Sequence, residues 1–525
     1  MPTLNWVGKD EVLNHNPAYY TLEKKYTFNS KNNTSENMII KGDNLLALKA
    51  LLPKYEGKIK CIYIDPPYNT GNENWVYNDN VNSPKIKKWL GEVVAKDDLS
   101  RHDKWLCMML PRLKLLHRLL SDDGVIFISI DDNEMANLKL LCDEVIGGGN
   151  AVACIPRLTS AQRPAQENFI STKHDYLIIY AKNKNTSYFN KIIERDLTKI
   201  RIDNIGKYFD GDSSPILASS TQGYSVGGDY DFEYNGKIYK PVDSKGNRRR
   251  WLWTIERMKA AAKLGILVET KTTLRVKNYI DKEFQVGTNV MVNKNENLIA
   301  TSFDLMNSNF TNDKGTGEIE KIGISNFTFP KPQNLIEFCI KLATDKNSII
   351  LDSFAGSGTT AHAVLELNKK DGGNRKFILV EMEDYAENIT AKRVKRVIKG
   401  YGKEPENSAT GGDFSFYELG DRLLLENGNL NEKVSIEKIR EYIYFSETKE
   451  KCEQNDSDFL GECNGVAYYF IYKKDDITTL DFEYLAKLKK ASSYVIYADV
   501  CVLSDETMMK YNITFKKIPR DIKKV

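Results

Sequence analysis

The sequence predicts an α/β protein with a doubly wound, mostly parallel sheet, and three observations lead to this fold class. Short apolar runs of strand type alternate with amphipathic stretches of helical type in residues 38–184 and again in 331–402. Two of the runs end in punctuated loops, "DPPYNTG" at 65–71 and "DSFAGSG" at 352–358. Within the intervening stretch, 185–330, the part from 210 to 253 is rich in Gly, Ser, Asp and Tyr. Strands that alternate with helices are typical of parallel sheets covered on both faces.

The expected strands are short and apolar. They are "MIIKG", "CIYID", "GVIFISI" and "HDYLIIYAK" in the first stretch, and "SIILD" and "FILVE" in the second. Both punctuated loops follow the carboxyl end of a strand, which is where open α/β sheets bind their ligands. The sequence therefore predicts that the two loops meet at one edge of one sheet.

Composition limits the class of protein. The 525 residues, with 41% hydrophobic and 28% charged side chains, indicate a globular chain of several modules. The net charge of +3 is too small to indicate a particular class of binding partner. No apolar run has the roughly 18 residues of a membrane span, and residues 1–17 lack a signal segment, so a cytoplasmic protein is predicted. The eight cysteines and His102, His117 and His174 have no metal-ligand spacing, so neither zinc nor disulfides are expected.

The loop at 65–71 predicts a rigid site. Each of its two prolines fixes its own φ and lacks an N–H, and Pro67 also keeps Pro66 extended. The loop would hold the Asp65 carboxylate and the Tyr68 ring in fixed positions at the end of the 61–64 strand. An ordinary turn at the end of a strand is the alternative interpretation.

The second loop predicts a nucleoside cofactor. Gly356 and Gly358 allow the backbone to approach a ligand at the start of a helix, where N–H groups are free. Thr359 stands where a phosphate-binding P-loop needs a lysine, which disfavours nucleotide triphosphate hydrolysis. Glu381 follows on the next strand, at the usual distance for an acid that binds ribose hydroxyls, and Glu383 competes for that role.

These motifs together carry a family resemblance. "DPPYNTG" and "LDSFAGSGTTAHAV", the latter preceded by "FPKPQNLI", resemble the amino-methyltransferases that act on adenine in DNA, and their order resembles the β class. The resemblance is closest to the modification (Mod) subunits of type III restriction-modification systems, through "TNDKGTGEIEKIG" and "ITFKKIPRDIKKV". It implies a Rossmann-like fold that transfers a methyl group from S-adenosyl-L-methionine to adenine N6 in double-stranded DNA.

The resemblance implies roles for the residues of the first loop. Asp65 and the Pro66 carbonyl would accept the two amino hydrogens of adenine and so direct its lone pair toward the methyl donor. Pro67 would keep that carbonyl in place, and Tyr68 would stack on the base. A base inside a duplex is out of reach, so the nucleotide would have to flip into the site.

The resemblance also implies a cofactor site. Asp352 would meet the ammonium of the methionine moiety, Glu381 the ribose, and Asp43 the region of the cofactor adenine, although Asp43 also fits an ordinary helix N-cap. The remaining candidates lie around the methionine moiety and are Lys331, Pro332, Asn334, Leu335, Phe354, Gly356, Gly358 and Thr359.

Five segments are predicted along the chain. They are an extended arm (1–37), the catalytic part (38–184), a target-recognition region (185–330), the cofactor-binding part (331–402) and a small α/β module for assembly (403–525). Within the recognition region, residues 245–277 hold ten Lys or Arg and two acids. The candidate DNA-binding residues there are Arg248, Arg249, Arg250, Trp251 and Trp253, with a solvated surface loop as the alternative.

Other functions remain open from sequence alone. A stand-alone adenine methyltransferase would carry the same motifs as a Mod subunit. A cytosine-N4 methyltransferase uses similar geometry, but a serine more often replaces the acid at position 65. A catalytically silent DNA-binding protein is a third alternative. The C-terminal module would pair either with a second copy of the chain or with a restriction subunit.

Overall fold

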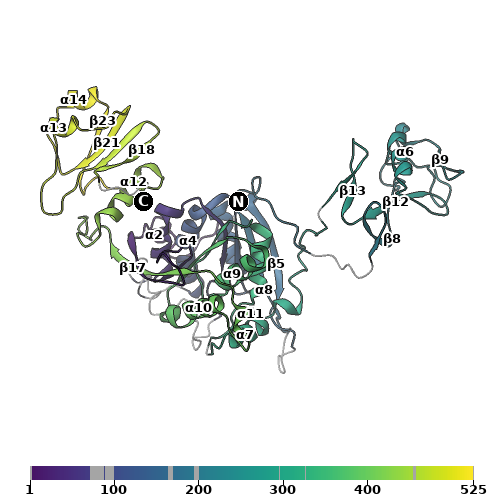
Figure 1. Ribbon diagram of the computed structural model, residues 1–525, viewed down its shortest axis with the longest axis horizontal. Coiled ribbons are helices and arrows are strands. Elements are labelled where there is room, and N and C mark those ends of the chain that lie inside the picture. The colour runs from purple at the N-terminus through teal and green to yellow at the C-terminus, as the bar shows by residue number, and fades with distance from the viewer. Residues whose placement is uncertain are drawn as a thin grey trace. The chain divides into compact units, whose positions relative to one another are not determined.

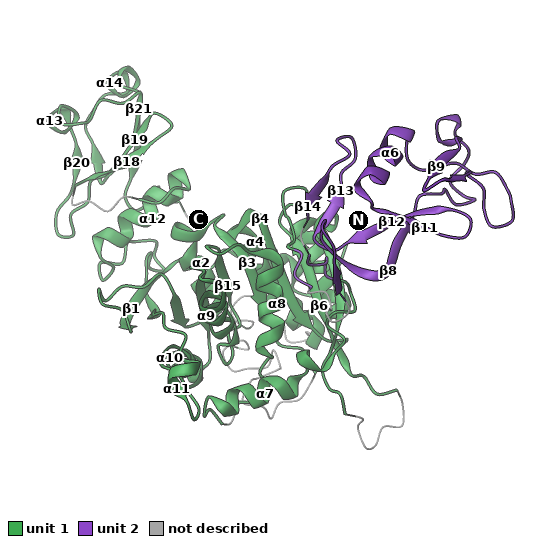
Figure 2. Cartoon of the chain, turned by 45° about the vertical axis from the view of Figure 1, so that its right-hand side comes forward, with its two compact units in different colours: residues 1–190, 301–525 green, residues 191–300 purple. Residues whose placement is uncertain are grey.

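The computed structural model describes residues 3–70, 88, 91, 100–162, 170–193, 200–294, 296–325, 327–452 and 457–523. The chain forms two compact units, one from residues 1–190 with 301–525 and the other from 191–300 (Figure 2). The second unit is shorter than the predicted recognition region of 185–330, because residues 185–190 and 301–330 belong to the first unit.

A nine-stranded sheet forms the centre of the first unit, in the order β1-β17-β2-β16-β15-β3-β4-β6-β5 (Figure 1). The neighbouring pairs from β17 to β4 are parallel, whereas β1 and β6 run antiparallel to their neighbours. The strands in sheet order are Tyr20–Phe28, Phe414–Arg422, Met38–Lys41, Lys376–Glu381, Ile349–Asp352, Ile59–Ile64, Leu120–Ile130, His174–Ala181 and Ala151–Leu158. The predicted mostly parallel sheet is thereby confirmed.

Helices cover both faces of this sheet. On one face α2 and α4 pack together with α1 and α5, and on the other α8 lies against β3 and β4 while α9 lies against β16 and α10. Every residue of β3 is buried, as expected for a strand between two helical layers. The helices are α1 (Lys9–Leu13), α2 (Asn44–Tyr55), α4 (Arg101–Leu119), α5 (Met135–Cys142), α7 (Asn312–Lys321), α8 (Gln333–Ala343), α9 (Thr359–Asp371), α10 (Lys392–Lys399) and α11 (Pro405–Ser408).

Two predicted boundaries differ from the structure. Residues 1–37 do not form only an arm, since β1 within them is an edge strand of the main sheet. Similarly, β17 lies inside the predicted C-terminal module, yet it pairs with β2 of the main sheet. Both strands are distant in sequence from the two punctuated loops. Neither strand has a local sequence pattern that predicts which strand it pairs with.

After β17 the chain forms a smaller sheet with its own apolar clusters. Its order is β18-β19-β21-β23, and a further strand pair is β20-β22. The elements are α12 (Ile436–Thr448), β18 (Phe459–Cys463), β19 (Val466–Phe470), β20 (Thr479–Leu480), α13 (Phe482–Leu485), β21 (Ser493–Ala498), β22 (Val500–Cys501), α14 (Asp505–Lys510) and β23 (Ile513–Lys517). This part therefore has the small α/β architecture that the sequence predicts.

The second unit has its own core around Trp251, Met258 and Tyr279. A four-stranded sheet of order β11-β12-β8-β7 is joined by the hairpins β9-β10 and β13-β14 and by α6. Their bounds are Ile200–Ile202 (β7), Lys207–Pro215 (β8), Phe232–Tyr234 (β9), Lys237–Tyr239 (β10), Ile255–Leu264 (α6), Leu267–Glu269 (β11), Leu274–Tyr279 (β12), Lys282–Phe284 (β13) and Met291–Asn293 (β14). Within the described ranges of the whole chain, no helix combines the length and apolarity of a membrane span.

Candidate active site

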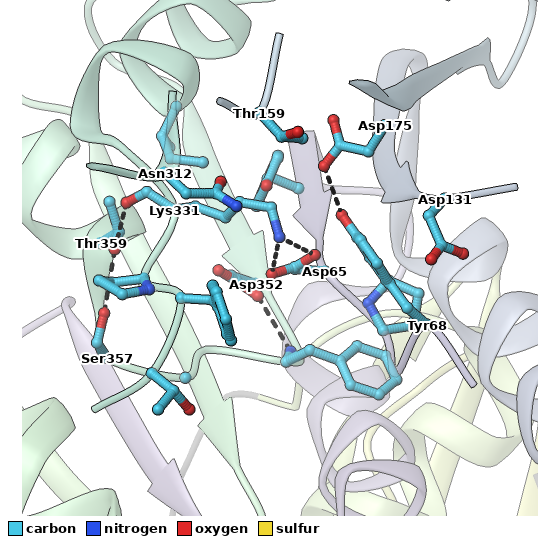
Figure 3. Close-up of a pocket in the computed structure, with 18 of the residues that line it drawn as sticks. Asp65, Tyr68, Asp131, Thr159, Asp175, Asn312, Lys331, Asp352, Ser357 and Thr359 are labelled. Carbon is cyan, nitrogen blue, oxygen red and sulfur yellow. Dashed lines mark hydrogen bonds and ion pairs between the residues drawn. The ribbon is translucent and has the colours of Figure 1, made fainter. Parts of the chain in front are cut away.

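A cavity of about 450 Å³ lies at the carboxyl ends of the parallel strands (Figure 3). Asp65 follows β3, Asp131 follows β4, and Asp352 ends β15, so three neighbouring strands each supply an acid to the cavity. The antiparallel β6 brings Asp175 to the same edge by its amino end. The remaining lining residues include Tyr68, Thr159, Asn312, residues 327–331, the loop residues 354–357, and Thr359 and Thr360 at the start of α9.

Lys331 forms an ion pair with Asp65 inside this cavity. The Lys331 Nζ lies 2.6 Å from both carboxylate oxygens and 4.8 Å from the centre of the Tyr68 ring. Both charged side chains are largely buried, with 11% and 19% of their surfaces exposed. The sequence predicts Lys331 beside the methionine moiety of the cofactor, whereas in the structure its ammonium lies on the carboxylate that is predicted to receive the target base.

Tyr68 is held by a buried ion pair that the sequence did not reveal. Its hydroxyl donates to Asp175 Oδ2 at 2.9 Å, and Arg157 Nε donates to Asp175 Oδ1 at 2.7 Å. Arg157 also donates to the Phe310 carbonyl at 2.7 Å. Burial raises the pKa of Tyr68 well above its ordinary value, and the nearby carboxylates of Asp175 and Asp65 add to this effect. Tyr68 is therefore a neutral phenol whose ring orientation is fixed.

The two prolines have different surroundings. The Pro67 carbonyl accepts a 2.7 Å hydrogen bond from the Trp105 indole, which is fully buried. Pro66 lines the cavity. Pro67 thus anchors the loop to α4, and Pro66 is the proline next to the ligand space. The loop is held again at Asn69, a buried residue with φ of 59° whose amide donates to the buried carboxylate of Glu134.

Asp352 is a buried carboxylate in the cavity wall. Its Oδ1 accepts from the Phe354 N–H at 3.0 Å and its Oδ2 accepts from the Thr360 hydroxyl at 2.5 Å. Burial raises the pKa of Asp352 to about 7, although these hydrogen bonds act in the opposite direction. A cationic group placed next to it would favour the ionised form. Asp352 can therefore serve as the predicted partner of an ammonium.

Glu381 braces the glycine loop through its carboxylate. Its Oε2 accepts from the Gly356 N–H at 2.7 Å and its Oε1 accepts from the Glu383 N–H at 3.0 Å. Burial raises the pKa of Glu381 to about 7. Glu381 lies outside the set of described residues that line the cavity, so its predicted contact with a ribose stays a prediction.

The two glycines of the loop are required for different reasons. Gly356 lines the cavity with φ of 50°, as expected for close approach to a ligand. Gly358 has φ of 81°, and a Cβ there would lie 3.2 Å from both the methyl carbon and the carbonyl oxygen of Thr390. Gly358 is therefore needed for the turn and for packing against Thr390, and its predicted approach to the cofactor stays a prediction. Thr359 lines the cavity.

Four of the predicted cofactor residues are not among the described residues that line the cavity. Asp43 caps α2 by accepting from the N–H groups of residues 45 and 46, which is the alternative that the sequence left open. Pro332 is the N-cap of α8, Leu335 is fully buried in the protein core, and the Asn334 amide donates to the Asn309 carbonyl. In this segment, residues 327–331 line the cavity, whereas residues 332–335 do not.

The basic run of the second unit makes contacts within that unit. Arg248 and Arg249 pair with Asp229 and Asp243 at 2.7 Å, and Arg250 donates to the carbonyls of residues 222 and 223. Trp251 is 1% exposed and belongs to the core, so the predicted DNA contact is wrong for this side chain. Trp253 packs against the same core and against Arg257, whose guanidinium lies 4.6 Å from its ring.

Sequence reasoning missed several cavity residues. Asp131 and Asn133 follow the expected strand "GVIFISI" directly, so the rule that strands deliver ligand groups at their carboxyl ends could have found them. The pairing of Arg157 with Asp175 depends on the antiparallel register of β5 and β6, in which the two residues are opposite each other. No local pattern encodes that register. Among the described residues, no group of three His, Cys, Asp or Glu side chains could hold a metal ion.

Comparisons with known proteins place this site in a family. A family model described as "DNA methylase" matches residues 59–392, more than half of the 525 residues. The EcoPI Mod subunit, from a type III restriction-modification enzyme of Escherichia phage P1, is 31% identical in an alignment of 460 positions that covers 78% of this chain and 70% of the relative. The type II methyltransferase M.KpnI of Klebsiella pneumoniae is 32% identical over 69% of this chain and 84% of its own length.

A third relative differs more in length. The StyLTI Mod subunit of Salmonella typhimurium is 32% identical over 69% of this chain, but the match covers 54% of that longer protein. The family match includes both punctuated loops and the strands that carry them. The chain therefore belongs to the DNA methylase family.

Proposed function

We propose that this chain transfers a methyl group to the exocyclic N6 of adenine in double-stranded DNA after the base has flipped out of the helix. Membership of the DNA methylase family makes S-adenosyl-L-methionine-dependent methylation of DNA the activity of the chain, and the choice of adenine is the proposal. The observation that carries it is the Asp65 carboxylate beside the fixed Tyr68 ring in one cavity with the glycine loop.

The cavity residues fit the methyl donor. A volume of about 450 Å³ is ordinary for a small-molecule site. Asp352 offers a buried carboxylate for the donor's ammonium, and Gly356 offers a wall without a side chain. When bound, S-adenosylmethionine supplies a methyl group on a positively charged sulfur. The residues that would hold it are Asp352, Phe354, Gly356 and Thr359.

The chain's own groups would activate the base. The amino nitrogen of adenine is a weak nucleophile because its lone pair is delocalised into the ring. The Asp65 carboxylate and the Pro66 carbonyl accept hydrogen bonds from its two N–H groups. These hydrogen bonds localise the lone pair on the nitrogen. Positive charge grows on that nitrogen during transfer, so both acceptors stabilise the transition state more than the ground state. Tyr68 stacks on the base and offsets part of the cost of extrusion.

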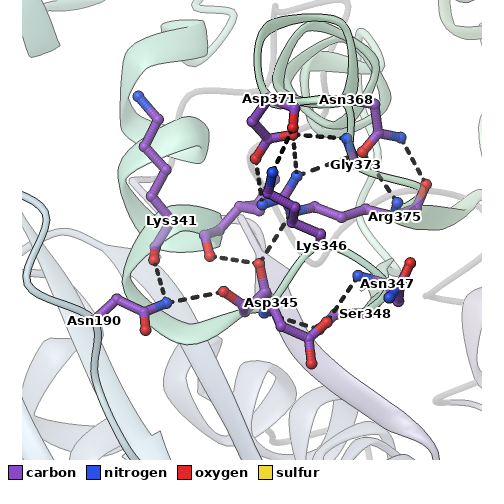
Figure 4. Close-up of polar contacts among 12 residues, drawn as sticks. Asn190, Lys341, Asp345, Lys346, Asn347, Ser348, Asn368, Asp371, Gly373 and Arg375 are labelled. Carbon is purple, nitrogen blue, oxygen red and sulfur yellow. Dashed lines mark hydrogen bonds and ion pairs between the residues drawn. The ribbon is translucent and has the colours of Figure 1, made fainter.

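The second unit is the proposed reader of the DNA sequence, with Arg248, Arg249 and Arg250 as candidate phosphate ligands. The chain passes from the first unit to the second between residues 190 and 191. Figure 4 shows Asn190, the last residue before this boundary, beside Lys341. The Asn190 amide donates to the carbonyls of Lys341 at 2.8 Å and Thr344 at 2.9 Å, and so caps the last turn of α8. Since the relatives come from bacteria and from a phage, the proposed place of action is the cytoplasm.

The choice between adenine and cytosine can be measured directly. Purified protein is incubated with unmethylated DNA and S-adenosylmethionine, and the digested nucleosides are separated by mass spectrometry. We expect N6-methyl-2′-deoxyadenosine and no N4-methyl-2′-deoxycytidine, and Asp65→Ala protein serves as the control. Product on cytosine alone would replace adenine by cytosine N4 as the target.

We propose in addition that the chain is the modification subunit of a type III restriction-modification system. The similarity to the EcoPI and StyLTI Mod subunits supports this assignment, and the match to M.KpnI keeps a stand-alone methyltransferase as the alternative. The sheet that follows β17 is the proposed assembly module, for a second copy of the chain or for a restriction subunit. Co-purification with a tagged restriction subunit from the same genome, with light scattering for the dimer, tests the proposal; a chain that stays monomeric and alone contradicts it.

A further inference from the structure

Lys331 occupies the position that the proposed function gives to the amino group of the target base. Its ammonium donates to both oxygens of Asp65 at 2.6 Å and lies 4.8 Å from the centre of the Tyr68 ring (Figure 3). An adenine that donates an amino hydrogen to Asp65 while it stacks on Tyr68 needs the same space. The ammonium and the amino group cannot both occupy it.

The backbone of Lys331 is held while its side chain can turn. Pro330 and Pro332 flank it and restrict the backbone on both sides, and its carbonyl accepts from the Thr359 hydroxyl at 3.3 Å. The four-carbon stem has several rotatable bonds, so the ammonium can leave Asp65 without movement of the loop. Exchange between lysine and base is therefore a side-chain event.

Charge gives the direction of the exchange. Without a base, the ammonium neutralises a carboxylate that is 19% exposed and would otherwise be poorly solvated. During methyl transfer, positive charge grows on the target nitrogen, and an ammonium still bound to Asp65 would repel it and take up its acceptor. The lysine therefore has to give way before transfer.

We propose that Lys331 is an exchangeable stand-in for the target amino group, which holds Asp65 in the free protein and is displaced when the flipped base enters. This inference rests on the proposed function, because it concerns the base that Asp65 receives. It makes the strength of the Lys331–Asp65 pair a determinant of how readily the base enters the site.

The test measures base extrusion in the absence of methyl donor. A duplex carries the recognition sequence, obtained by mapping methylated positions, with 2-aminopurine beside the target adenine as a reporter of lost stacking. At pH 8, Lys331→Met should favour extrusion by at least the about two- to fivefold that an exposed ion pair contributes, because this pair is largely buried. Lys331→Arg should weaken extrusion because it keeps a bidentate partner on Asp65. In an Asp65→Asn background the Lys331 variants should no longer differ.

Two controls separate this role from others. Lys341→Met removes a lysine charge on α8, outside the cavity, and should leave extrusion unchanged. Calorimetric titration with S-adenosylmethionine should give Lys331→Met an affinity within about twofold of the unmodified protein.

Several outcomes would overturn the inference. Weaker extrusion by Lys331→Met, no difference among the Lys331 variants, or an effect that persists with Asp65→Asn would mean that the lysine does not compete with the base. A large loss of cofactor affinity would return Lys331 to the methionine moiety. A wild-type protein that neither extrudes nor methylates adenine contradicts the proposed function instead.

Discussion

The Tyr68 hydroxyl donates a 2.9 Å hydrogen bond to Asp175, and Asp175 in turn neutralises Arg157 in an almost fully buried ion pair. The ring that is proposed to stack on the target base is therefore oriented by strands β5 and β6, outside the loop that contains it. This connection makes the motif depend on residues that are distant in sequence.

Removal of Asp175 should destabilise the protein strongly. Asp175→Ala leaves the Arg157 guanidinium buried without its carboxylate, and we expect the free energy of unfolding in urea to fall by about 3–5 kcal/mol. Replacing Arg157 and Asp175 together should lower the free energy of unfolding by less than the sum of the two single replacements, because no unpaired charge remains. Additive losses would show that the two side chains are not coupled in solution.

Cofactor binding should depend on pH through Asp352. Burial raises the pKa of this carboxyl from 3.8 to about 7, and the ionised form is the one that pairs with the cofactor's ammonium. Affinity for S-adenosylmethionine should therefore be about tenfold lower at pH 6 than at pH 8, by titration of one group near pH 7. Asp352→Asn should bind weakly and lose most of this difference. A pH-independent affinity of the unmodified protein would contradict the role.

The same carboxyl has an opposite effect on the stability of the free protein. Its folded pKa lies above its unfolded value, so folding takes up a proton, and stability from this group is lost as pH rises from about 4 to about 7. Asp352→Asn should accordingly raise the thermal midpoint at pH 8 more than at pH 4.

Gly358 offers a matched comparison with Gly402. Both have left-handed backbones, with φ of 81° and 79°, but a Cβ at Gly402 meets no atom within 4 Å, whereas at Gly358 it meets Thr390 at 3.2 Å. Gly402→Ala should cost about 1 kcal/mol of unfolding free energy for its backbone conformation alone. Gly358→Ala should cost more and also weaken cofactor binding, because Thr390 supports the glycine loop through the Gly356 carbonyl. If both variants lost the same free energy of unfolding and Gly358→Ala kept its affinity for the cofactor, packing of Gly358 against Thr390 would not matter for the site.

The arginine run in the second unit should contribute to DNA affinity through phosphates. Arg248, which pairs with Asp229, has 65% of its side chain exposed and is more exposed than Arg249. Replacing Arg248, Arg249 and Arg250 by Ala should lower affinity for matched and mismatched duplexes alike, and reduce the slope of log affinity against log salt by up to about 0.9 for each phosphate that is no longer neutralised. Ala at three exposed lysines, Lys473, Lys474 and Lys490, is the charge control. An unchanged slope would leave the run as a solvated surface whose arginines bind only their own unit.

The sequence was most informative where a motif combines strand, loop and residue chemistry. Asp65, Pro66, Tyr68, Asp352 and Gly356 could be predicted because each lies at or just after the end of a buried strand, and the structure brings all five to one cavity. The sequence was least informative about contacts between residues that are far apart along the chain.

Distant partners explain the differences from prediction. The pairing of β1 with β17, the end of the second unit at residue 300, and the burial of Trp251 depend on tertiary packing that local patterns do not contain. The Lys331–Asp65 pair joins residues 266 positions apart, and nothing in either motif alone indicates it.

Asp65 also provides the most direct test of the central claim. The chain and its Asp65→Ala variant are expressed in a host that lacks DNA methylation, and methylated positions are mapped across the genome by single-molecule sequencing. The account predicts N6-methyladenine in one short sequence context for the unmodified chain and none for the variant, although the variant still binds S-adenosylmethionine. Methylation that persists in Asp65→Ala, or that appears only on cytosine, would contradict it.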